Sequence, residues 1–450
     1  MEDLQMTKEI TNATIKSFSE KLSNKPGADV VKRTIMKNGI LASSQNMDSQ
    51  IAMDQTFSVE IDTGDVANQK QSGRCWMFAA LNTMRHPLQA NFKLKGFELS
   101  QNYINFWDKF EKSNWFYENI INTAALPLGD RKVDFLLTTP QQDGGQWDML
   151  VALIQKYGLV PKSVMPETYS SSKSNELNSQ LNLKLRKDAI TLRKLVNDGN
   201  DETVVEAKKD ELLEEVYRML VFTLGTPPTK FDFEYRDDDK EYHRYADLTP
   251  QSFFQKFVGW NLDDYVSIIN SPQSDKPFNH TYTVEFLGNV VNGRQVKHLN
   301  LEVEELKRLA VTQLQAGETV WFGSDVGQSS ERQLGIMDTE YYKKDELFDV
   351  DFSMTKAERL DYAESLMTHA MVITGVDLVN GKPTKWKVEN SWGDKVGKKG
   401  YFVMSDEWFS QFVYQVVINK QFLADAEKTT YETEEPKVLA PWDPMGALAL

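Results

Sequence analysis

Residues 68–85 read NQKQSGRCWMFAALNTMR and combine a polar turn with a helix. Ser72 and Gly73 form a turn-like pair, and from Cys75 to Pro87 the chain contains no glycine or proline. Alanine, leucine and methionine dominate that interval, and these residues have high helix propensity. The pattern predicts a helix that starts at Cys75.

Cys75 is the only cysteine of the chain, and a free cysteine is usually just a small buried hydrophobe. Three neighbouring features favour a nucleophile instead. A helix N-terminus stabilises a thiolate through its backbone N–H groups. Gly73 lets the backbone approach a substrate closely. Gln69 lies six positions upstream and offers a side-chain amide as a donor to an oxyanion.

A thiol nucleophile needs a base, and the chain has five histidines: His86, His243, His280, His298 and His369. His86 lies eleven residues along the helix of Cys75, about 16 Å away, which excludes it as the base. We expect His243 and His298 to be solvated, because charged or polar residues surround them, and His280 gives no signal. His369 opens the apolar run HAMVITGV and therefore lies at the end of a largely buried strand.

The segment after His369 predicts a partner for this histidine. Asn380-Gly381 is a strong signal for a two-residue hairpin turn. With these residues as the turn, His369 lies opposite Trp392, and Asn390 is its diagonal neighbour on the same face. The hairpin then supplies an amide oxygen that orients the imidazole and a tryptophan that shields their bond, which is the base-plus-orienter arrangement of nucleophilic catalysis.

Composition excludes several other classes of function. The 450 residues are 40% hydrophobic and 26% charged, as in ordinary globular proteins, and the net charge of −15 gives no support to nucleic-acid binding. One cysteine excludes an intrachain disulfide and multi-cysteine zinc sites, and the histidines lack metal-ligand spacing, so we expect neither a metal nor an organic cofactor.

The sequence also predicts a cytoplasmic protein without membrane association. No apolar run approaches the roughly 18 residues of a membrane-spanning helix. The N-terminus MEDLQMTKEI is polar and acidic, unlike a secretory signal, and a lone cysteine suits a reducing compartment.

Residue patterns divide the chain into four predicted regions. Residues 1–169 contain predicted helices at 11–22, 99–121 and 147–157, besides the helix of Cys75. Residues 170–275 form a hook-like helical insertion with two amphipathic helices and an exposed charged loop at 236–241. Residues 276–435 are β-rich and carry His369 and Asn390. Residues 436–450 form a C-terminal arm.

Three segments together carry a resemblance to a known family. QSGRCW, HAMVITGV and ENSWGDKVGKKGYFVM resemble, in this order, the active-site blocks of papain-family cysteine peptidases. The resemblance implies an α+β fold of two lobes, one helical and one β-barrel-like, with catalytic Cys75, His369 and Asn390. It also implies Gln69 in the oxyanion hole and a supporting Trp392. Gly144-Gly145 resembles the paired glycines that line the substrate cleft of this family.

Departures from the family pattern narrow the resemblance to one branch. Ser72 stands where family members usually carry a disulfide-forming cysteine, and Arg74 where serine or alanine is common. Cys75 and His369 are 294 positions apart (369 − 75), against roughly 130–150 in the family. These departures, and the ending PWDPMGALA, resemble the bleomycin hydrolase and aminopeptidase C branch.

The branch implies an activity, an assembly and a role for the arm. Its members are cytosolic homohexameric aminopeptidases, whose partners are peptide substrates with a free N-terminus. The arm is then expected to lie in the cleft, with the terminal carboxylate of Leu450, or of Ala449 after trimming, facing the substrate's ammonium group. Two alternatives stay open on the sequence: a papain-like endopeptidase or other thiol acyl hydrolase, and a non-catalytic binding or assembly protein that keeps the fold.

Overall fold

The computed structural model describes residues 8–449, which fall into two units. One unit comprises residues 8–52 with 340–353, and the other residues 53–339 with 354–449. The predicted site residue Leu450 lies outside the described residues. Each unit is described by itself below.

The smaller unit is helical and exposes much of its apolar surface. Thr11 caps α1, confirming the helix predicted there, and Ile15, Phe18 and Leu22 on that helix are 52%, 62% and 58% exposed. No residue of the first three helices is buried. The helices are α1 (Asn12–Ser23), α2 (Ala28–Asn38), α3 (Ile40–Ser43), α4 (Met47–Ala52) and α14 (Lys344–Phe348).

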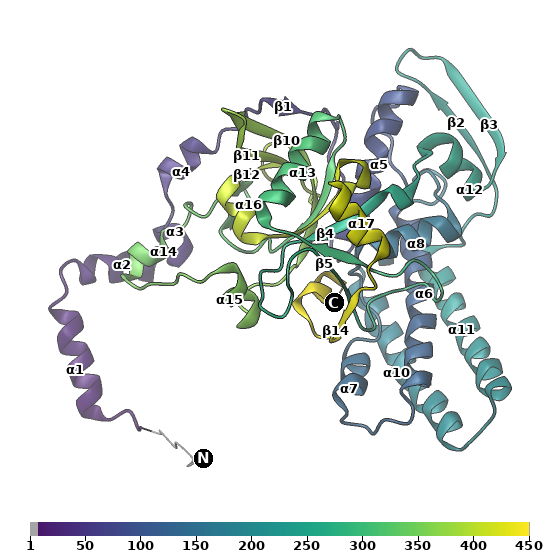
Figure 1. Ribbon diagram of the computed structural model, residues 1–450, viewed down its shortest axis with the longest axis horizontal. Helices are drawn as coiled ribbons and strands as arrows, with labels where there is room; N and C mark the ends of the chain where they lie inside the picture. Colours follow the sequence, from purple (N-terminus) through teal and green to yellow (C-terminus); the bar gives the residue numbers. More distant parts are fainter. Residues whose placement is uncertain (1–7, 450) are drawn as a thin grey trace. The chain divides into compact units, whose positions relative to one another are not determined.

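Long amphipathic helices form the first part of the larger unit. The helices α6, α10 and α11 contact one another (Figure 1). On α10, Leu181, Leu185 and Leu192 are fully buried, as the predicted apolar face requires. The elements are α5 (Cys75–Phe92), α6 (Gln101–Asn122), α7 (Arg131–Thr138), α8 (Trp147–Tyr157), α9 (Tyr169–Ser172), α10 (Asn175–Asn197), α11 (Glu202–Leu224), α12 (Pro250–Phe253), the π-helix η1 (Phe254–Val258) and the 3-10 helix η2 (Leu262–Asp264).

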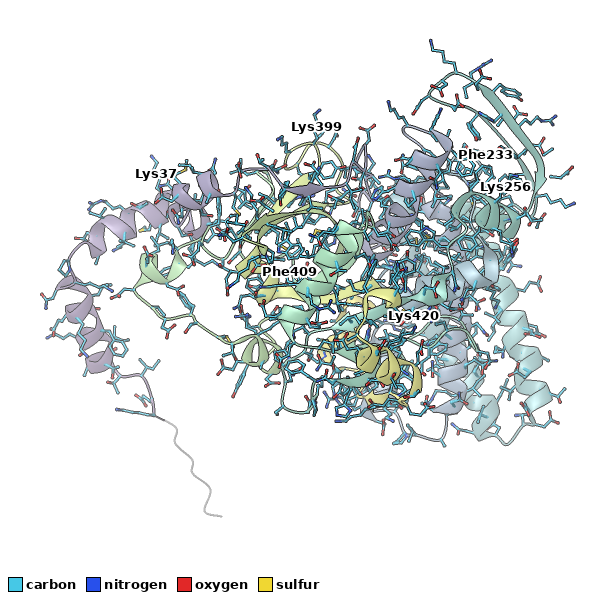
Figure 2. The ribbon with its side chains drawn as sticks, turned by 45° about the horizontal axis from the view of Figure 1, so that its top comes forward. Lys37, Phe233, Lys256, Lys399, Phe409 and Lys420 are labelled. Atoms are coloured by element: carbon cyan, nitrogen blue, oxygen red, sulfur yellow. The ribbon has the colours of Figure 1, made fainter. Side chains whose placement is uncertain are left out.

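The insertion contains a β-hairpin that the sequence reasoning missed. The strands β2 (Phe231–Arg236) and β3 (Tyr242–Leu248) pair in antiparallel fashion, and the predicted charged loop is their turn. Phe233 packs on Phe253 and Phe257, with ring centroids 5.5 and 5.2 Å apart, beside Lys256 (Figure 2). Alternating apolar residues therefore fix this hairpin to α12 and η1.

A mixed sheet forms the second part of the larger unit. Its described strands run in the order β14-β5-β6-β4-β13-β7-β10-β11-β12-β9-β8, and β1 adds to β10. The strands are β1 (Val59–Glu60), β4 (Tyr265–Ile269), β5 (His280–Val284), β6 (His298–Asn300), β7 (Val320–Ser324), β8 (Ser330–Glu331), β9 (Ile336–Met337), β10 (His369–Val379), β11 (Lys382–Glu389), β12 (Tyr401–Ser405), β13 (Val413–Asn419) and β14 (Lys437–Leu439).

Helices pack around this sheet and bury its central strands. Every residue of β4 and β7 is buried, and Phe409 stacks on Trp386 with ring centroids 4.8 Å apart, whereas Lys399 is exposed (Figure 2). The helices are α13 (Val303–Gln315), α15 (Lys356–Asp361), α16 (Asp406–Phe412), α17 (Asp425–Thr433) and the 3-10 helices η3 (Lys420–Phe422) and η4 (Pro444–Ala449).

Strand β10 joins two hydrophobic cores of the larger unit. Its Ala370 and Val372 belong to a core shared with the long helices, whereas Met371 and Ile373 belong to a core within the sheet region. This alternation follows from the two-residue period of a strand. Helix α5 packs on β10, so Cys75 and His369 are carried by elements in direct contact.

Candidate active site

Cys75 is the first residue of α5 and lies in a nearly closed environment. The backbone N–H groups of Met77 and Phe78 bond to the carbonyl of Arg74, which establishes the first turn. The thiol is 4% exposed, and the backbone N–H of Ala370 donates to its Sγ atom at 3.5 Å. Because Ala370 follows His369, the structure brings the predicted nucleophile beside the predicted base.

Burial governs the ionisation of this thiol. Desolvation raises the pKa of Cys75 to about 11, although backbone N–H groups of Ala370 and of the helix start act in the opposite direction. The helix start favours the thiolate, as the sequence predicts, but its effect is the smaller one. Burial acts more strongly than the helix start and favours the protonated thiol in this closed form.

The hairpin of His369 and Asn390 has the predicted register. Val379 pairs with Lys382 next to the turn, and Val372 pairs with Glu389 at the other end. Two irregularities, between Ile373 and Gly375 and between Asp377 and Leu378, cancel each other. The strand pairs next to the site therefore have the same register as the pairs next to the turn.

The ring of His369 is oriented as the hairpin predicts. Its Nε2 lies 2.9 Å from Oδ1 of Asn390, which leaves Nδ1 as the nitrogen available to the thiol. The ring of His369 stacks on that of Trp392, with centroids 4.9 Å apart. The guanidinium group of Arg332 lies over the ring of Trp392, 4.3 Å from its centroid. Burial lowers the pKa of His369 to about 4, against a smaller opposite effect of Asn390, so the imidazole is neutral and can act as a base.

Gln69 is held in the loop that precedes Cys75. Its Nε2 donates to the carbonyl of Ser72 at 2.6 Å, and its Oε1 accepts from the hydroxyl of Ser391 at 2.5 Å. Its backbone N–H also donates to the carbonyl of Ser391 at 2.8 Å. These bonds fix the amide next to the nucleophile and leave one N–H of Nε2 for a further acceptor.

Gly144 and Gly145 contact the chain's own C-terminal arm. The N–H of Gly145 donates to the carbonyl of Leu448 at 3.1 Å. A Cβ atom on Gly144 would clash with that carbonyl, and one on Gly145 would clash with the ring of Trp76. Only glycine therefore allows the arm and the tryptophan to approach this segment so closely.

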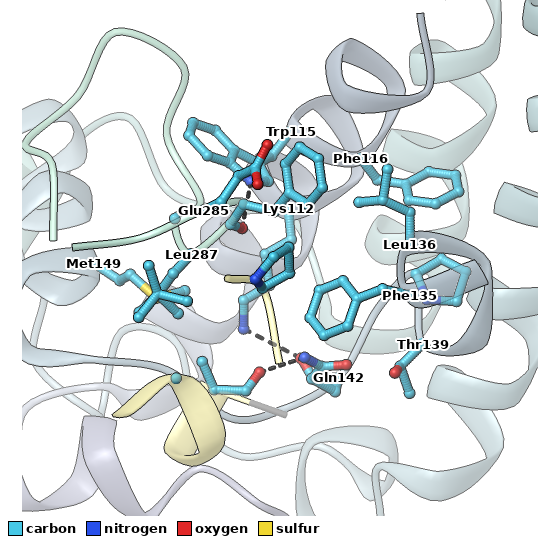
Figure 3. A pocket seen from close by; sticks show the side chains of 17 residues that line it. Lys112, Trp115, Phe116, Phe135, Leu136, Thr139, Gln142, Met149, Glu285 and Leu287 are labelled. Atoms are coloured by element: carbon cyan, nitrogen blue, oxygen red, sulfur yellow. Dashed lines mark hydrogen bonds between the residues drawn. The ribbon is translucent and has the colours of Figure 1, made fainter. Parts of the chain in front are cut away.

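Side chains around the glycines hold both the segment and the arm. Lys112 of α6 donates to the carbonyl of Gly144 at 2.5 Å, and the side-chain amide of Gln142 donates to the carbonyl of Ala449 (Figure 3). These residues line a pocket whose other walls are mainly apolar. Farther back, Lys276 forms a buried ion pair with Asp443 at 2.9 Å, which anchors the base of the arm.

Two histidines outside the candidate site are buried. His298 is fully buried and hydrogen-bonds the hydroxyl of Ser267 at 2.7 Å, so the expectation of a solvated residue is wrong. His86 is buried with Nε2 3.0 Å from Glu389, which also contacts Arg85 at 3.1 Å. This buried ion cluster joins α5 to the residue before Asn390. Glu389, an acidic residue directly before Asn390 in the predicted strand, is the sequence signal that could have pointed to it.

Within residues 8–449, no group of three or more histidine, cysteine, aspartate or glutamate residues could hold a metal ion. No helix in the same part of the chain is long and apolar enough to cross a membrane.

Comparisons with known proteins agree over nearly the whole chain. A family model described as peptidase C1-like family matches residues 9–446. Aminopeptidase C of Lactobacillus delbrueckii subsp. lactis is 61% identical over 446 residues, 99% of each chain. Aminopeptidase G of the same organism is 45% identical, over 97% of this chain and 99% of its own. The crystal structure of pepw from Lactobacillus rhamnosis HN001 superposes on this chain with a TM-score of 0.97 and 69% sequence identity. The match covers 98% of this chain and 100% of that one.

Proposed function

Since the chain belongs to the peptidase C1-like family of papain-like α+β peptidases, we propose that it is a cysteine aminopeptidase with Cys75 as nucleophile. One observation supports this proposal above others. The arm hydrogen-bonds the glycine segment at Gly145, where an extended peptide would otherwise bind. In this proposal the arm blocks the cleft beyond the first residue of a substrate.

The proposed reaction is acyl transfer in two steps. Nδ1 of His369 accepts the thiol proton as Sγ of Cys75 bonds to the first carbonyl carbon of the substrate. The side-chain amide of Gln69 and the backbone N–H of Cys75 stabilise the oxyanion. The imidazolium then protonates the leaving amine as the C–N bond breaks. Water, deprotonated by the imidazole, releases the amino acid and restores the thiol.

Two further residues support the base in this scheme. Oδ1 of Asn390 accepts a hydrogen bond from Nε2–H of His369, which keeps Nδ1 directed at the sulfur. Trp392 covers the ring of His369 and limits competition from water for that bond. Neither a metal nor an organic cofactor takes part in these steps.

A substitution at the nucleophile tests the proposal. We expect Cys75→Ala to abolish release of aminomethylcoumarin from leucyl-aminomethylcoumarin, because no other group can form the acyl intermediate. Substantial residual turnover by this variant would contradict the assignment, and the unchanged circular dichroism spectrum serves as the control for folding.

Blocking the substrate distinguishes an aminopeptidase from an endopeptidase. We expect acetylation of the substrate's amino group to lower kcat/KM by about 100-fold. Acetylation removes the ammonium charge, so the terminal carboxylate of the arm loses its partner. Deleting the last four residues should abolish this preference. Equal cleavage of blocked and free substrates by the intact chain would favour the endopeptidase alternative.

We further propose a cytoplasmic homohexamer of the bleomycin hydrolase type. The exposed apolar side chains of α1 and α2, among them Phe18 and Met36 at 62% and 77% exposure, support an assembly that covers them. Sedimentation equilibrium tests the mass: six chains are expected, and a monomer at micromolar concentration would contradict the assembly. Replacing Phe18 with serine should weaken it.

A further inference from the structure

Asp143 contacts residues on both sides of Cys75. Its Oδ2 accepts the backbone N–H of Gly73 at 2.8 Å, and its carbonyl accepts the indole N–H of Trp76 at 2.7 Å. Asp143 also directly precedes Gly144, the start of the segment on which the arm lies. One residue therefore connects the loop of the nucleophile with the glycine segment.

The approach between Gly73 and Asp143 leaves little room for a side chain. A Cβ atom at position 73 would lie 3.0 Å from Cβ of Asp143. Real Cβ atoms rarely tolerate that distance, so glycine at this position lets the backbone N–H reach the carboxylate. The loop and the aspartate are thus matched in shape as well as in hydrogen bonding.

The carboxylate of Asp143 is buried but charged. Burial would raise its pKa, but the ammonium group of Lys109, at 2.9 Å from Oδ1, and the donors of Ser174 and Gly73 lower the pKa below its usual value. Lys109 is itself fully buried. A buried ion pair is rigid when hydrogen bonds fill the remaining lone pairs of its carboxylate. Removing only one partner is costly, because it leaves the other charge buried and unpaired.

The start of the helical insertion supplies the remaining partners of Asp143. The hydroxyl of Ser174 donates to Oδ2, and the side-chain amide of Asn178 donates to Oδ1 at 2.9 Å. Nearby, the N–H of Gln71 donates to the carbonyl of Ser172 at 3.0 Å. The insertion is therefore hydrogen-bonded both to the loop of the nucleophile and to Asp143.

From these contacts, and resting on the proposed function, we infer that Asp143 is a positioning residue for the reaction. It sets the separation between the loop of Cys75 and the substrate-binding segment Gly144–Gly145, and the insertion holds it through Ser174 and Asn178. The insertion is thereby part of the support of the active site, in addition to any role in assembly.

Replacement of Asp143 tests this inference, with Asp188→Ala as the matched control. Asp188 is also a buried carboxylate bonded to a tyrosine and a lysine, Tyr117 and Lys184, but it does not contact the loop. We expect Asp143→Ala to lower kcat for leucyl-aminomethylcoumarin by about 100-fold with little change in KM, because nucleophile and bound substrate lose their alignment. Asp188→Ala should lower the thermal midpoint but leave kcat and KM unchanged.

Milder variants keep the test valid if Asp143→Ala does not fold. Asp143→Asn preserves shape and should retain an intermediate kcat. Ser174→Ala and Asn178→Ala leave the carboxylate in place and should each lower kcat by about tenfold. If the folded variants at 143, 174 and 178 keep kcat within about twofold of the parent, the inference is wrong.

A measurement without peptide substrate separates this inference from the proposed function. The rate of alkylation of Cys75 by iodoacetamide reports the placement of the thiol loop whether or not the protein cleaves peptides. The charge of Asp143 itself raises the pKa of the thiol, so Asp143→Asn, which removes the charge but keeps the shape, is the reference. Asp143→Ala should differ from Asp143→Asn in that rate at neutral pH, and Asp188→Ala should match the parent. If the parent protein lacks aminopeptidase activity but the two variants at 143 differ in this way, the proposed function fails and the positioning role stands; equal rates in Asp143→Asn and Asp143→Ala overturn the positioning role.

Discussion

The two sides of the candidate site are held by different kinds of interaction. On one side, His369 and Asn390 belong to a hairpin whose paired strands form a continuous antiparallel ladder apart from two cancelling irregularities. On the other side, the loop of residues 69–76 is held mainly by side chains from remote segments, such as Ser391 on Gln69 and Glu167 on Arg74. Comparable placement thus arises from a local backbone pattern on one side and from long-range polar contacts on the other.

This difference predicts how each side fails. A backbone ladder is redundant, so a single substitution in the hairpin removes a functional group but leaves the geometry. Buried polar contacts are not redundant, because loss of one partner leaves another charge or donor unsatisfied. Substitutions on the two sides should therefore fail in these two different ways.

The largest expected effect is on catalysis, at the hairpin. We expect His369→Gln to lower kcat/KM by about 10⁴-fold or more, because the base is lost while the ladder stays intact. The measurement is turnover of leucyl-aminomethylcoumarin at neutral pH. His298→Gln, a change at another buried histidine, is the control and should leave activity close to that of the parent. Retention of a tenth of the parent activity by His369→Gln would exclude this residue as the base.

The next effect is on stability, at the loop. Arg74 is 1% exposed in its side chain and bonds both carboxylate oxygens of Glu167, at 3.1 and 2.7 Å. Glu167→Gln leaves the guanidinium without its counter-charge, so we expect the free energy of unfolding to fall by about 3–5 kcal/mol. Urea denaturation measures this change. Glu305→Gln, which affects an ion pair with the half-exposed Arg308, should cost less than about 1 kcal/mol; equal losses would argue against a special role for the loop.

The two sides should also respond at opposite ends of the pH range. Because the native pKa of His369 is about 4 and its usual value is 6.5, the unfolded chain binds a proton that the native chain excludes. Stability contributed by this residue should therefore fall as pH drops from 6.5 to 4, by about 3 kcal/mol. The native pKa of Cys75 is about 11 against a usual 9.0, so its contribution should be lost as pH rises between these values, again by about 3 kcal/mol.

Variants assign each pH effect to its residue. His369→Gln should flatten the acidic part of the stability profile relative to the parent, and Cys75→Ala should flatten the alkaline part. Unfolding by urea at several pH values gives both profiles. Identical acidic slopes in the parent and His369→Gln would show that the imidazole is not held neutral by burial.

The smallest effect is expected at the turn of the hairpin. Gly381 has a φ of +77°, and a Cβ atom there would meet nothing within 4 Å. Gly381→Ala should therefore cost only the backbone strain of the left-handed conformation, about 1–2 kcal/mol, with unchanged kcat. Gly327→Ala lies outside that conformation and should show no such cost. Thermal unfolding is sufficient to compare them.

The hairpin was predictable from sequence because its information is local. Asn380-Gly381 specified the turn, and the two-residue period of a strand specified the faces, so the neighbours of His369 followed from counting. The two cancelling irregularities could not be foreseen, since they depend on packing of β10 against other elements, but they did not change the outcome. The helices α10 and α11 were predictable for the same reason: their apolar faces repeat with the helical period.

Features that depend on contacts between remote residues could not be predicted from the sequence. Nothing around Asp143 indicates that Ser174 and Lys109 would converge on its carboxylate. His298 appears in a polar context, yet β6 lies between two other strands and buries it. The segment 340–353 groups with residues up to 52, nearly 300 positions earlier, and no local pattern signals that association. Long-range packing of this kind is set by the whole fold.

The ionic support around Asp143 has a consequence for redox behaviour. Because the chain has a single cysteine, no disulfide within it can tie the loop of Cys75 to the glycine segment, and that connection is made by hydrogen bonds and an ion pair. Reductants break disulfides but leave such contacts intact. Conditions that are strongly reducing, and that protect the sulfur from oxidation to sulfenic or sulfinic acid, therefore leave the surrounding scaffold untouched. In this molecule, conditions that keep the sulfur reduced do not weaken the contacts that hold the site together.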